Sequence, residues 1–403
     1  MGKKSNKLAD FRRDMSISRG PVDVPFLLLT LLLLTIGVVM VLSASYASAY
    51  YDISNETGGK ATYYFMRQLA FAGIGVVAML FFSRFPVAFF RKFAFWVMVV
   101  ALGLMVAVLI IGIGNAQATR WIVIAGISIQ PSEIAKIGVI LVFANMICNY
   151  KNEMGTFKRG VLPFAIILGV IIILLAFQPH YSAAIIIIVI GAAMMFVGGT
   201  RSIWFVGGLL LVAALMLLAM SVSDYAAARV VIWQDPFSDP RGDGFQVVQS
   251  LYAIGSGGMF GLGLGQSRQK YLYLPEEHND FIFSIVCEEL GFIGALLILI
   301  LFALLIIRGY WIALHCRDRY GFLVCMGITT LFALQVLLNV AVCTNTIPAT
   351  GISLPFFSYG GTALLMQLAE MGIVLSISRD VPLRKTTAKQ RPLLRKTQKG
   401  DAA

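Results

Sequence analysis

The chain has 403 residues, of which 59% are hydrophobic and only 13% are charged, and its mean hydropathy is +0.84. This balance excludes an ordinary soluble globular protein and is typical of a polytopic membrane protein. The net charge of +12 does not indicate nucleic acid as a partner. The basic residues are concentrated in the two tails, where they suit contact with a membrane surface.

Apolar runs of roughly 20 residues, the length that crosses a bilayer, predict ten transmembrane helices. In chain order these lie near residues 22–45, 63–83, 93–114, 131–149, 161–178, 182–199, 204–222, 281–307, 321–343 and 358–378. The fifth and sixth are separate because Pro179, in "QPHYS", breaks a helix. The predicted fold class is therefore an all-α polytopic membrane protein.

The distribution of basic residues predicts how the chain is oriented in the membrane. If the N-terminus is inside, most of the 32 lysines and arginines fall on inner segments, so the positive-inside rule places both termini in the cytoplasm. We expect a basic N-tail at residues 1–21, a membrane domain at 22–378 and a basic, disordered C-tail at 379–403. The longest outer loop, about residues 223–280, joins helices seven and eight, and its apolar stretches indicate an ordered, functional loop.

The stretch "LPEEHNDFIF" contains the strongest candidate for a catalytic residue. Asp280 precedes the eighth helix at the lipid–water boundary, where partial desolvation raises the pKa of a carboxyl group and makes it a useful base. The alternative is that Asp280 caps the helix. Glu288 lies eight residues further along the same helical stripe, whereas Glu289 points roughly to the opposite side. We expect one of these two glutamates to face the interior.

Three other motifs supply supporting candidates. In "QPSEIAKIG", Glu133 and Lys136 share one face of the fourth helix and form either part of a site or an internal ion pair. In "QATRWIVIAG", Arg120 is a candidate anion contact and Trp121 an apolar platform, although interfacial tryptophans are commonly belt residues. Ser358, in "SLPFFSYGGT", offers a hydroxyl or close helix packing.

Lys270 is one of the few basic residues in the long outer loop. Because this position runs against the positive-inside rule, an external anion such as a lipid phosphate would explain it, as would simple contact with lipid headgroups.

The motifs "RWIVIAGISIQPSEIAK", "DPRGDGFQVVQSLYAIGSGGMFGLGLGQSRQKYLYLPEEHNDFIF", "EELGFIG" and "TGISLPFFSYGG" occur in this order. Together they resemble the SEDS family (shape, elongation, division and sporulation) of bacterial membrane proteins, in particular its FtsW and SpoVE branch. The resemblance extends from about Pro21 to Arg379. It departs from the family pattern at His180, in "QPHYSA" where the family usually has "QPDLGT", and at Asn279, in "HNDF" where the family usually has "HTDF".

The resemblance implies a peptidoglycan glycosyltransferase of the bacterial cytoplasmic membrane. Such an enzyme polymerises lipid II, a disaccharide-peptide on undecaprenyl diphosphate, at the outer face during cell division or spore cortex synthesis. By motif position, Asp280 matches the family's essential carboxylate, Glu133 and Lys136 match polar residues of the central cavity, and Trp121 matches a loop tryptophan. The implied partners are a class B penicillin-binding protein transpeptidase and other divisome proteins, and the implied location is the division septum.

Chemistry favours a single base, because a diphosphate leaving group departs without a proton from an acid. We expect Asp280 to deprotonate the 4-hydroxyl of the acceptor sugar for inverting attack on the donor. Cationic side chains, or a divalent cation such as Mg or Mn, would neutralise the leaving diphosphate.

Two alternatives remain at this point: a lipid II flippase and a non-catalytic division scaffold. A flippase needs polar groups across the membrane, and the candidates for such a path are Asn145, Gln335, Asn339, Gln367 and Glu370. The density of charge at the outer end favours the enzyme.

Overall fold

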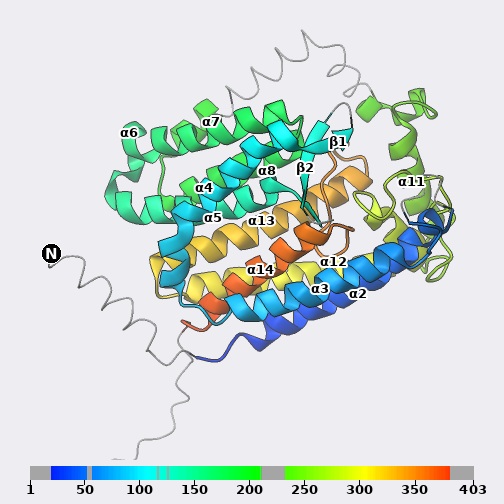
Figure 1. The fold of residues 1–403 in the computed structure, drawn as a ribbon, viewed down its shortest axis with the longest axis horizontal. Coiled ribbons are helices and arrows are strands. Elements are labelled where there is room, and N and C mark those ends of the chain that lie inside the picture. The colour runs from blue at the N-terminus through cyan, green and yellow to red at the C-terminus, as the bar shows by residue number, and fades with distance from the viewer. Residues whose placement is uncertain are drawn as a thin grey trace, which may run out of the picture.

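The computed structural model describes residues 20–51, 57–115, 118–124, 127–208, 210 and 232–381. Within these residues, nine segments are long and apolar enough to cross a membrane, and they lie side by side in one bundle (Figure 1). They are α2 (Val24–Tyr50), α3 (Tyr63–Phe82), α4 (Val87–Ile111), α5 (Pro131–Tyr150), α6 (Phe157–Gly160) with α7 (Leu162–Phe177), α8 (Tyr181–Gly198), α12 (Ile282–His315), α13 (Arg319–Cys343) and α14 (Gly361–Ser378).

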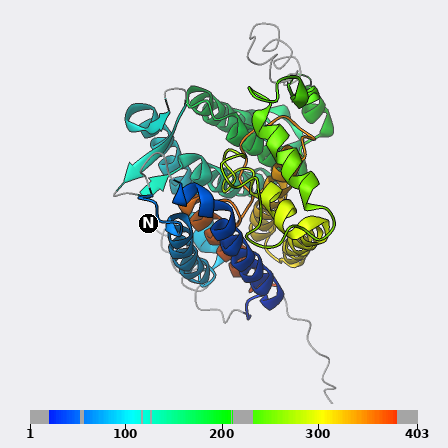
Figure 2. The ribbon, with the colours of Figure 1, turned by 90° about the vertical axis from the view of Figure 1, so that its right-hand side faces the viewer.

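The described spans confirm the helices expected at these places, with ends that shift by a few residues. The predicted helix at 204–222 and the predicted disordered C-tail lie largely outside the described residues, so the count of ten stays a prediction. A shorter helix, α11 (Phe245–Gly257), lies in the segment predicted to be an ordered outer loop. Figure 2 faces this end of the bundle and shows the segment between α11 and α12 lying over it.

Local sequence signals set several helix ends. The Asp23 side chain accepts a hydrogen bond from the Phe26 N–H (3.0 Å) and caps α2. Helix α5 begins at Pro131, as expected for a first-turn proline. Helices α7 and α8 end and begin on either side of the "QPH" turn, as Pro179 predicts.

The two ends of the described membrane domain meet at one side of the bundle. The Gly20 N–H donates to the Arg379 carbonyl (3.1 Å), and the Arg379 guanidinium donates back to the Gly20 carbonyl (2.9 Å). The Asp23 carboxylate also pairs with the Arg308 guanidinium at 2.7 Å. The N-terminal and C-terminal ends of this domain are therefore on the same side, and their cytoplasmic placement stays a prediction.

A small sheet follows α4, where we expected only a loop. Strands β1 (Ile113–Asn115), β2 (Ala118–Ile124) and β3 (Ile127–Ile129) are antiparallel in the order β1-β2-β3. The segment "ATRWIVI" explains the difference, because β-branched and aromatic residues favour extended backbone. The sheet places Arg120 and Trp121 on a strand.

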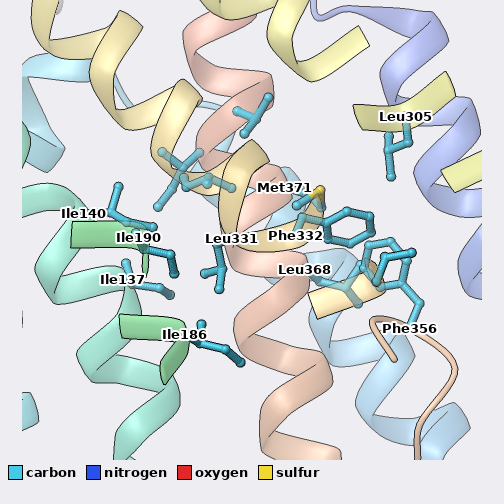
Figure 3. Close-up of a cluster of buried hydrophobic side chains, with 14 of the residues drawn as sticks. Ile137, Ile140, Ile186, Ile190, Leu305, Leu331, Phe332, Phe356, Leu368 and Met371 are labelled. Carbon is cyan, nitrogen blue, oxygen red and sulfur yellow. The ribbon is translucent and has the colours of Figure 1, made fainter. Parts of the chain in front are cut away.

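Helix α13 lies at the centre of the apolar core. Figure 3 shows buried side chains of α5 and α8 on one side of it, and those of α12, α14 and the segment before α14 on the other. Many side chains on the rim are apolar yet uncovered: Ile110 is 79% exposed and Phe177 is 70% exposed. Uncovered apolar side chains of this size on spanning helices indicate contact with lipid.

Helix α12 is broken at Gly291, whose φ and ψ of 67° and −174° are not helical. The segment after α11 occupies the break. The Leu262 N–H donates to the Glu288 carbonyl (3.0 Å), and the Phe292 N–H donates to the Gly258 carbonyl (2.9 Å). In an unbroken helix the Phe292 N–H would bind the Glu288 carbonyl instead. The break therefore exchanges helical hydrogen bonds for bonds to the loop and leaves these groups satisfied.

The crossing at this break needs glycine. Gly261 and Gly291 both have positive φ, and a Cβ placed on Gly291 would lie only 2.2 Å from the Gly261 nitrogen. The two backbones approach too closely for any other residue type.

We expect Gly291→Ala to lower the free energy of unfolding by at least about 2 kcal/mol, because of backbone strain and overpacking. The matched control is Gly73→Ala in α3, where no atom lies within 4 Å of the added Cβ. Thermal melts of the purified proteins in detergent should show a clearly lower midpoint for Gly291→Ala and an unchanged or higher one for Gly73→Ala. Equal midpoints would contradict the close crossing.

Candidate active site

Asp280 lies in the turn before α12, and its carboxylate does not cap that helix. The N-cap position is Phe281, and none of the described side chains caps the helix there. The backbone of Asp280 is fixed instead, because its carbonyl accepts a 2.7 Å hydrogen bond from the Asn339 amide. The carboxylate faces Gly351, where an added Cβ would lie 3.1 Å from Oδ2. Asp280 is thus held in place without using its carboxylate.

The segment before α14 is hydrogen-bonded to the turn that carries Asp280. The Ser358 hydroxyl donates to the Asn279 carbonyl (2.8 Å) and accepts from the Leu354 N–H (2.7 Å). The Tyr359 N–H donates to the His278 carbonyl (2.8 Å). Ser358, a predicted site residue, therefore joins the two segments through its partly buried hydrogen bond to Asn279.

The surroundings of Asp280 raise the pKa of its carboxyl group. Burial, followed by the negative charge of Glu276, raises the pKa of the Asp280 carboxyl to about 6, while Arg120 and His278 act in the opposite direction. A carboxyl group with a pKa near 6 is mostly ionised at neutral pH and is a stronger base than an ordinary aspartate.

Arg120, on β2, connects the sheet to the turn between α7 and α8. Its guanidinium donates to the Pro179 carbonyl, and its positive charge acts on both Asp280 and His180. Burial, and then the charges of Arg120 and Lys136, lower the pKa of His180 to about 3. The imidazole that stands where the resembling family has an acid is therefore neutral at physiological pH.

The same turn also contacts the segment beside Asp280. The Ser182 hydroxyl at the start of α8 donates to the Thr350 carbonyl, next to Gly351. Arg120 and Asp280 are thus brought to one region, although they are far apart in the chain. Trp121 is partly exposed on the same strand as Arg120, and its role stays a prediction.

Glu133 and Lys136 form an ion pair within α5. The Lys136 Nζ lies 2.7 Å from the Glu133 Oε1, and both side chains are nearly buried. Of the two interpretations of "QPSEIAK", the internal ion pair is therefore present. A supporting role beside the substrate stays a prediction.

The expectation that Lys270 reaches an external anion is wrong. Lys270 is only 2% exposed, and its Nζ pairs with the Glu289 Oε1 at 2.9 Å. The Ser43 hydroxyl of α2 joins both groups, because it donates to Glu289 (2.6 Å) and accepts from Lys270 (3.3 Å). The physical reason is that a carboxylate buried at the start of α12 needs a cation, and the loop supplies one.

Glu288 and Glu289 are both interior residues, at 0% and 1% exposure, whereas we expected only one of them to be buried. The Glu288 carboxylate accepts from the Ser267 hydroxyl and from the N–H groups of Arg268 (3.0 Å) and Gln269 (3.3 Å). Both helix faces are covered because the loop inserts at the break in α12. Glu288 thus organises the loop backbone.

Several polar residues that would mark a transport path hold the fold together instead. The Asn339 amide donates to the carbonyls of Asp280 and Ile352, both at 2.7 Å. Gln367 accepts from the Phe356 N–H (3.0 Å), and Asn145 accepts from Arg91 (3.1 Å). These contacts do not favour the flippase alternative.

Sequence reasoning missed two positions that shape the site. The Gln68 amide on α3 donates to the Ser358 carbonyl (3.1 Å) and accepts from the Gly360 N–H (3.4 Å), and Gly351 leaves room for the Asp280 carboxylate. A single buried amide in an apolar span was an available signal for Gln68. For Gly351, the signal was a lone glycine in "TGISLP".

A divalent cation at this site stays a prediction. Among the described residues, no group of three or more His, Cys, Asp or Glu side chains is arranged to hold one. In this part of the chain, a divalent cation would be held by fewer protein ligands together with the phosphates of a substrate.

Comparison with known proteins finds relatives that match most of this chain. The chain is 41% identical to stage V sporulation protein E of Bacillus subtilis (strain 168), over 91% of this chain and 99% of that protein. It is 38% identical to the probable peptidoglycan glycosyltransferase FtsW of Trichlorobacter lovleyi, over 91% of this chain and 96% of that protein. It is 34% identical to FtsW of Bacillus subtilis, over 94% and 95% of the two chains.

Solved structures share the fold. A chain of a peptidoglycan synthase complex that coordinates polymerization and crosslinking is 27% identical, with a TM-score of 0.74 over 89% of this chain and 98% of that one. RodA, the rod shape determining protein of Thermus thermophilus, matches with a TM-score of 0.65 and 24% identity over 90% and 98% of the two chains. The family model for the cell cycle proteins FtsW, RodA and SpoVE matches residues 24–382. This multi-pass membrane protein therefore belongs to the FtsW, RodA and SpoVE family.

Proposed function

We propose that this protein is a peptidoglycan glycosyltransferase that polymerises lipid II at the outer face of the cytoplasmic membrane. One observation carries the proposal: Asp280 has a carboxylate that caps no helix, in a turn fixed by other groups, with its pKa raised to about 6. Relatives named peptidoglycan glycosyltransferase FtsW support the assignment. So does the likeness to a chain of a peptidoglycan synthase complex.

In the proposed reaction, Asp280 is the general base. Its ionised carboxylate takes the proton of the acceptor sugar's 4-hydroxyl as that oxygen attacks the anomeric carbon of the donor from the side opposite the leaving group. The bond from the anomeric carbon to the undecaprenyl diphosphate breaks, and the diphosphate leaves with the electron pair. Because this leaving group needs no proton, one carboxylate is sufficient, unlike the pair used by glycoside hydrolases.

The leaving diphosphate needs positive charge, and the Arg120 guanidinium is the cation that we place nearest to this step. Its charge already acts on Asp280, and the β2 strand and the Pro179 carbonyl fix its position. Lys270 is not available for this role, because Glu289 pairs with it. Preorganised cations of this kind stabilise charge that develops in the transition state.

The proposed partner is a class B penicillin-binding protein transpeptidase, which would cross-link the strands that this chain makes. The synthase complex that shares the fold combines polymerization with crosslinking, which supports such a pairing. Contacts with other divisome proteins and a place at the division septum belong to the same proposal.

We expect Asp280→Asn to lower the rate of lipid II polymerisation by about 10²–10⁴-fold, because the amide cannot accept the hydroxyl proton. The control is Asp243→Asn, which makes the same change at an exposed carboxylate just before α11. The measurement is gel analysis of polymer from fluorescent lipid II, with the candidate transpeptidase present and folding checked by thermal melt. Polymer from Asp280→Asn at the wild-type rate would remove Asp280 from the mechanism.

The polymerisation rate should also fall as the pH drops through about 6, because only the ionised form of Asp280 acts as a base. The negative charge of Glu276 raises this pKa, so Glu276→Gln should move the acidic limb of the rate profile to lower pH. Glu153→Gln, which changes an exposed glutamate paired with Arg159 elsewhere, should leave the limb in place. A shift to higher pH in Glu276→Gln would be inconsistent with the proposed electrostatics.

A further inference from the structure

A surface pocket lies in the segment between α11 and α12, which precedes the turn that carries Asp280. Its volume is about 600 Å³. The lining residues are Gln266, Ser267, Arg268, Gln269, Tyr271 and Tyr273. Asp280 lies seven positions after Tyr273 in the chain, and seven extended residues span at most about 25 Å. The pocket is therefore within that reach of the catalytic carboxylate.

The backbone of the pocket is fixed from beneath by a buried acid. The Glu288 carboxylate accepts hydrogen bonds from the Ser267 hydroxyl and from the N–H groups of Arg268 (3.0 Å) and Gln269 (3.3 Å). The Ser267 hydroxyl in turn accepts from the Lys270 N–H (3.2 Å). These bonds use donors on the inner side of the loop, so its shape does not depend on a ligand. Binding sites held by such supporting hydrogen bonds are preorganised.

Side chains on the outer side of this loop remain available. Arg268 and Tyr273 are exposed, and Tyr271 is 46% exposed. The Gln269 Oε1 is buried and accepts no hydrogen bond from any described residue. The Arg268 guanidinium makes no ion pair within the described part of the chain, in contrast to Lys270.

The lining chemistry points to a class of ligand. Two tyrosine rings offer flat apolar faces with polar rims, glutamine amides both donate and accept hydrogen bonds, and a guanidinium binds carboxylates. None of the described residues that line the pocket is acidic. Tyrosines that only anchor a protein at the lipid surface would not require amides, a guanidinium and a hollow between them.

We infer that this pocket binds an oligosaccharide that carries carboxylates. The inference rests on the proposed function, under which the oligosaccharide is the nascent glycan strand with its peptide side chains. The tyrosine rings pack against sugar rings, the amides bind hydroxyl and acetamido groups, and Arg268 binds a carboxylate. The pocket keeps the product beside Asp280 between additions, so that one strand is extended many times.

The test uses the full-length protein in nanodiscs and fluorescent, uncross-linked glycan oligomers that carry peptides. The pocket variant combines Arg268→Ala with Tyr273→Ala. Its control combines Arg241→Ala with Tyr252→Ala, which removes an exposed arginine and tyrosine elsewhere in the same outer segment. Fluorescence anisotropy should show at least tenfold weaker oligomer binding for the pocket variant, and less than twofold for the control. Gels should show shorter polymer for the pocket variant. Equal binding by the two doubles would overturn the inference.

A charge-reversal variant distinguishes the loss of one specific contact from a general loss of binding through misfolding. Arg268→Glu should weaken binding of the peptide-bearing oligomers at least tenfold, but should change binding of neutral N-acetylglucosamine oligomers by less than threefold. If the binding of both ligands weakens to the same extent, or the binding of neither ligand weakens, Arg268 does not bind a carboxylate and the inference is wrong.

The experiment separates failure of the pocket from failure of the proposed function. Asp280→Asn should bind the oligomers like the wild type. If the wild type binds them in this pocket but makes no polymer, the pocket is retained and the glycosyltransferase proposal fails. If the wild type makes polymer while the pocket variant binds the oligomers normally, the glycosyltransferase proposal is retained and the pocket inference fails.

Discussion

Backbone groups inside a membrane bundle must find hydrogen-bond partners within the protein, because lipid offers none. At Asp280 this constraint is met by the Asn339 amide, which donates to the carbonyls of Asp280 and Ile352. The Ser358 hydroxyl makes a similar link to Asn279. These two side chains satisfy the irregular backbone on both sides of the site, so the Asp280 carboxylate itself stays free for chemistry.

The same constraint explains the rest of this end of the bundle. Where α12 breaks at Gly291, the loop after α11 supplies the hydrogen bonds that the helix gives up. The loop brings Lys270 to Glu289 and brings its backbone donors to Glu288. Two buried acids therefore help to position the loop that lines the proposed oligosaccharide pocket.

Much of this architecture could be predicted from the sequence. The lengths of the apolar runs predicted the described spans. Pro179 predicted the break between α7 and α8, and Pro131 predicted the start of α5. The position of Asp280 just before a spanning helix follows from the abrupt change from charged to apolar residues. These features depend on local composition, which a sequence displays directly.

The features that were missed depend on which distant segments meet. Lys270 donates a hydrogen bond to Ser43, which is 227 residues away in the chain, and no local pattern indicates that contact. The break at Gly291 lies within an apolar run that is equally compatible with a continuous helix, and only the approach of Gly261 requires it. The strands after α4 were hidden because short β-branched runs are ambiguous in so apolar a chain.

The proposed mechanism requires the protein to hold Asp280 as a partly buried base. Infrared difference spectroscopy of the wild type against Asp280→Asn measures it most directly, by following the protonated carboxyl band of this one residue with pH in the absence of substrate. As the pH rises, the band should disappear with a midpoint near pH 6. A midpoint near 4, the value of an ordinary aspartate, would contradict it.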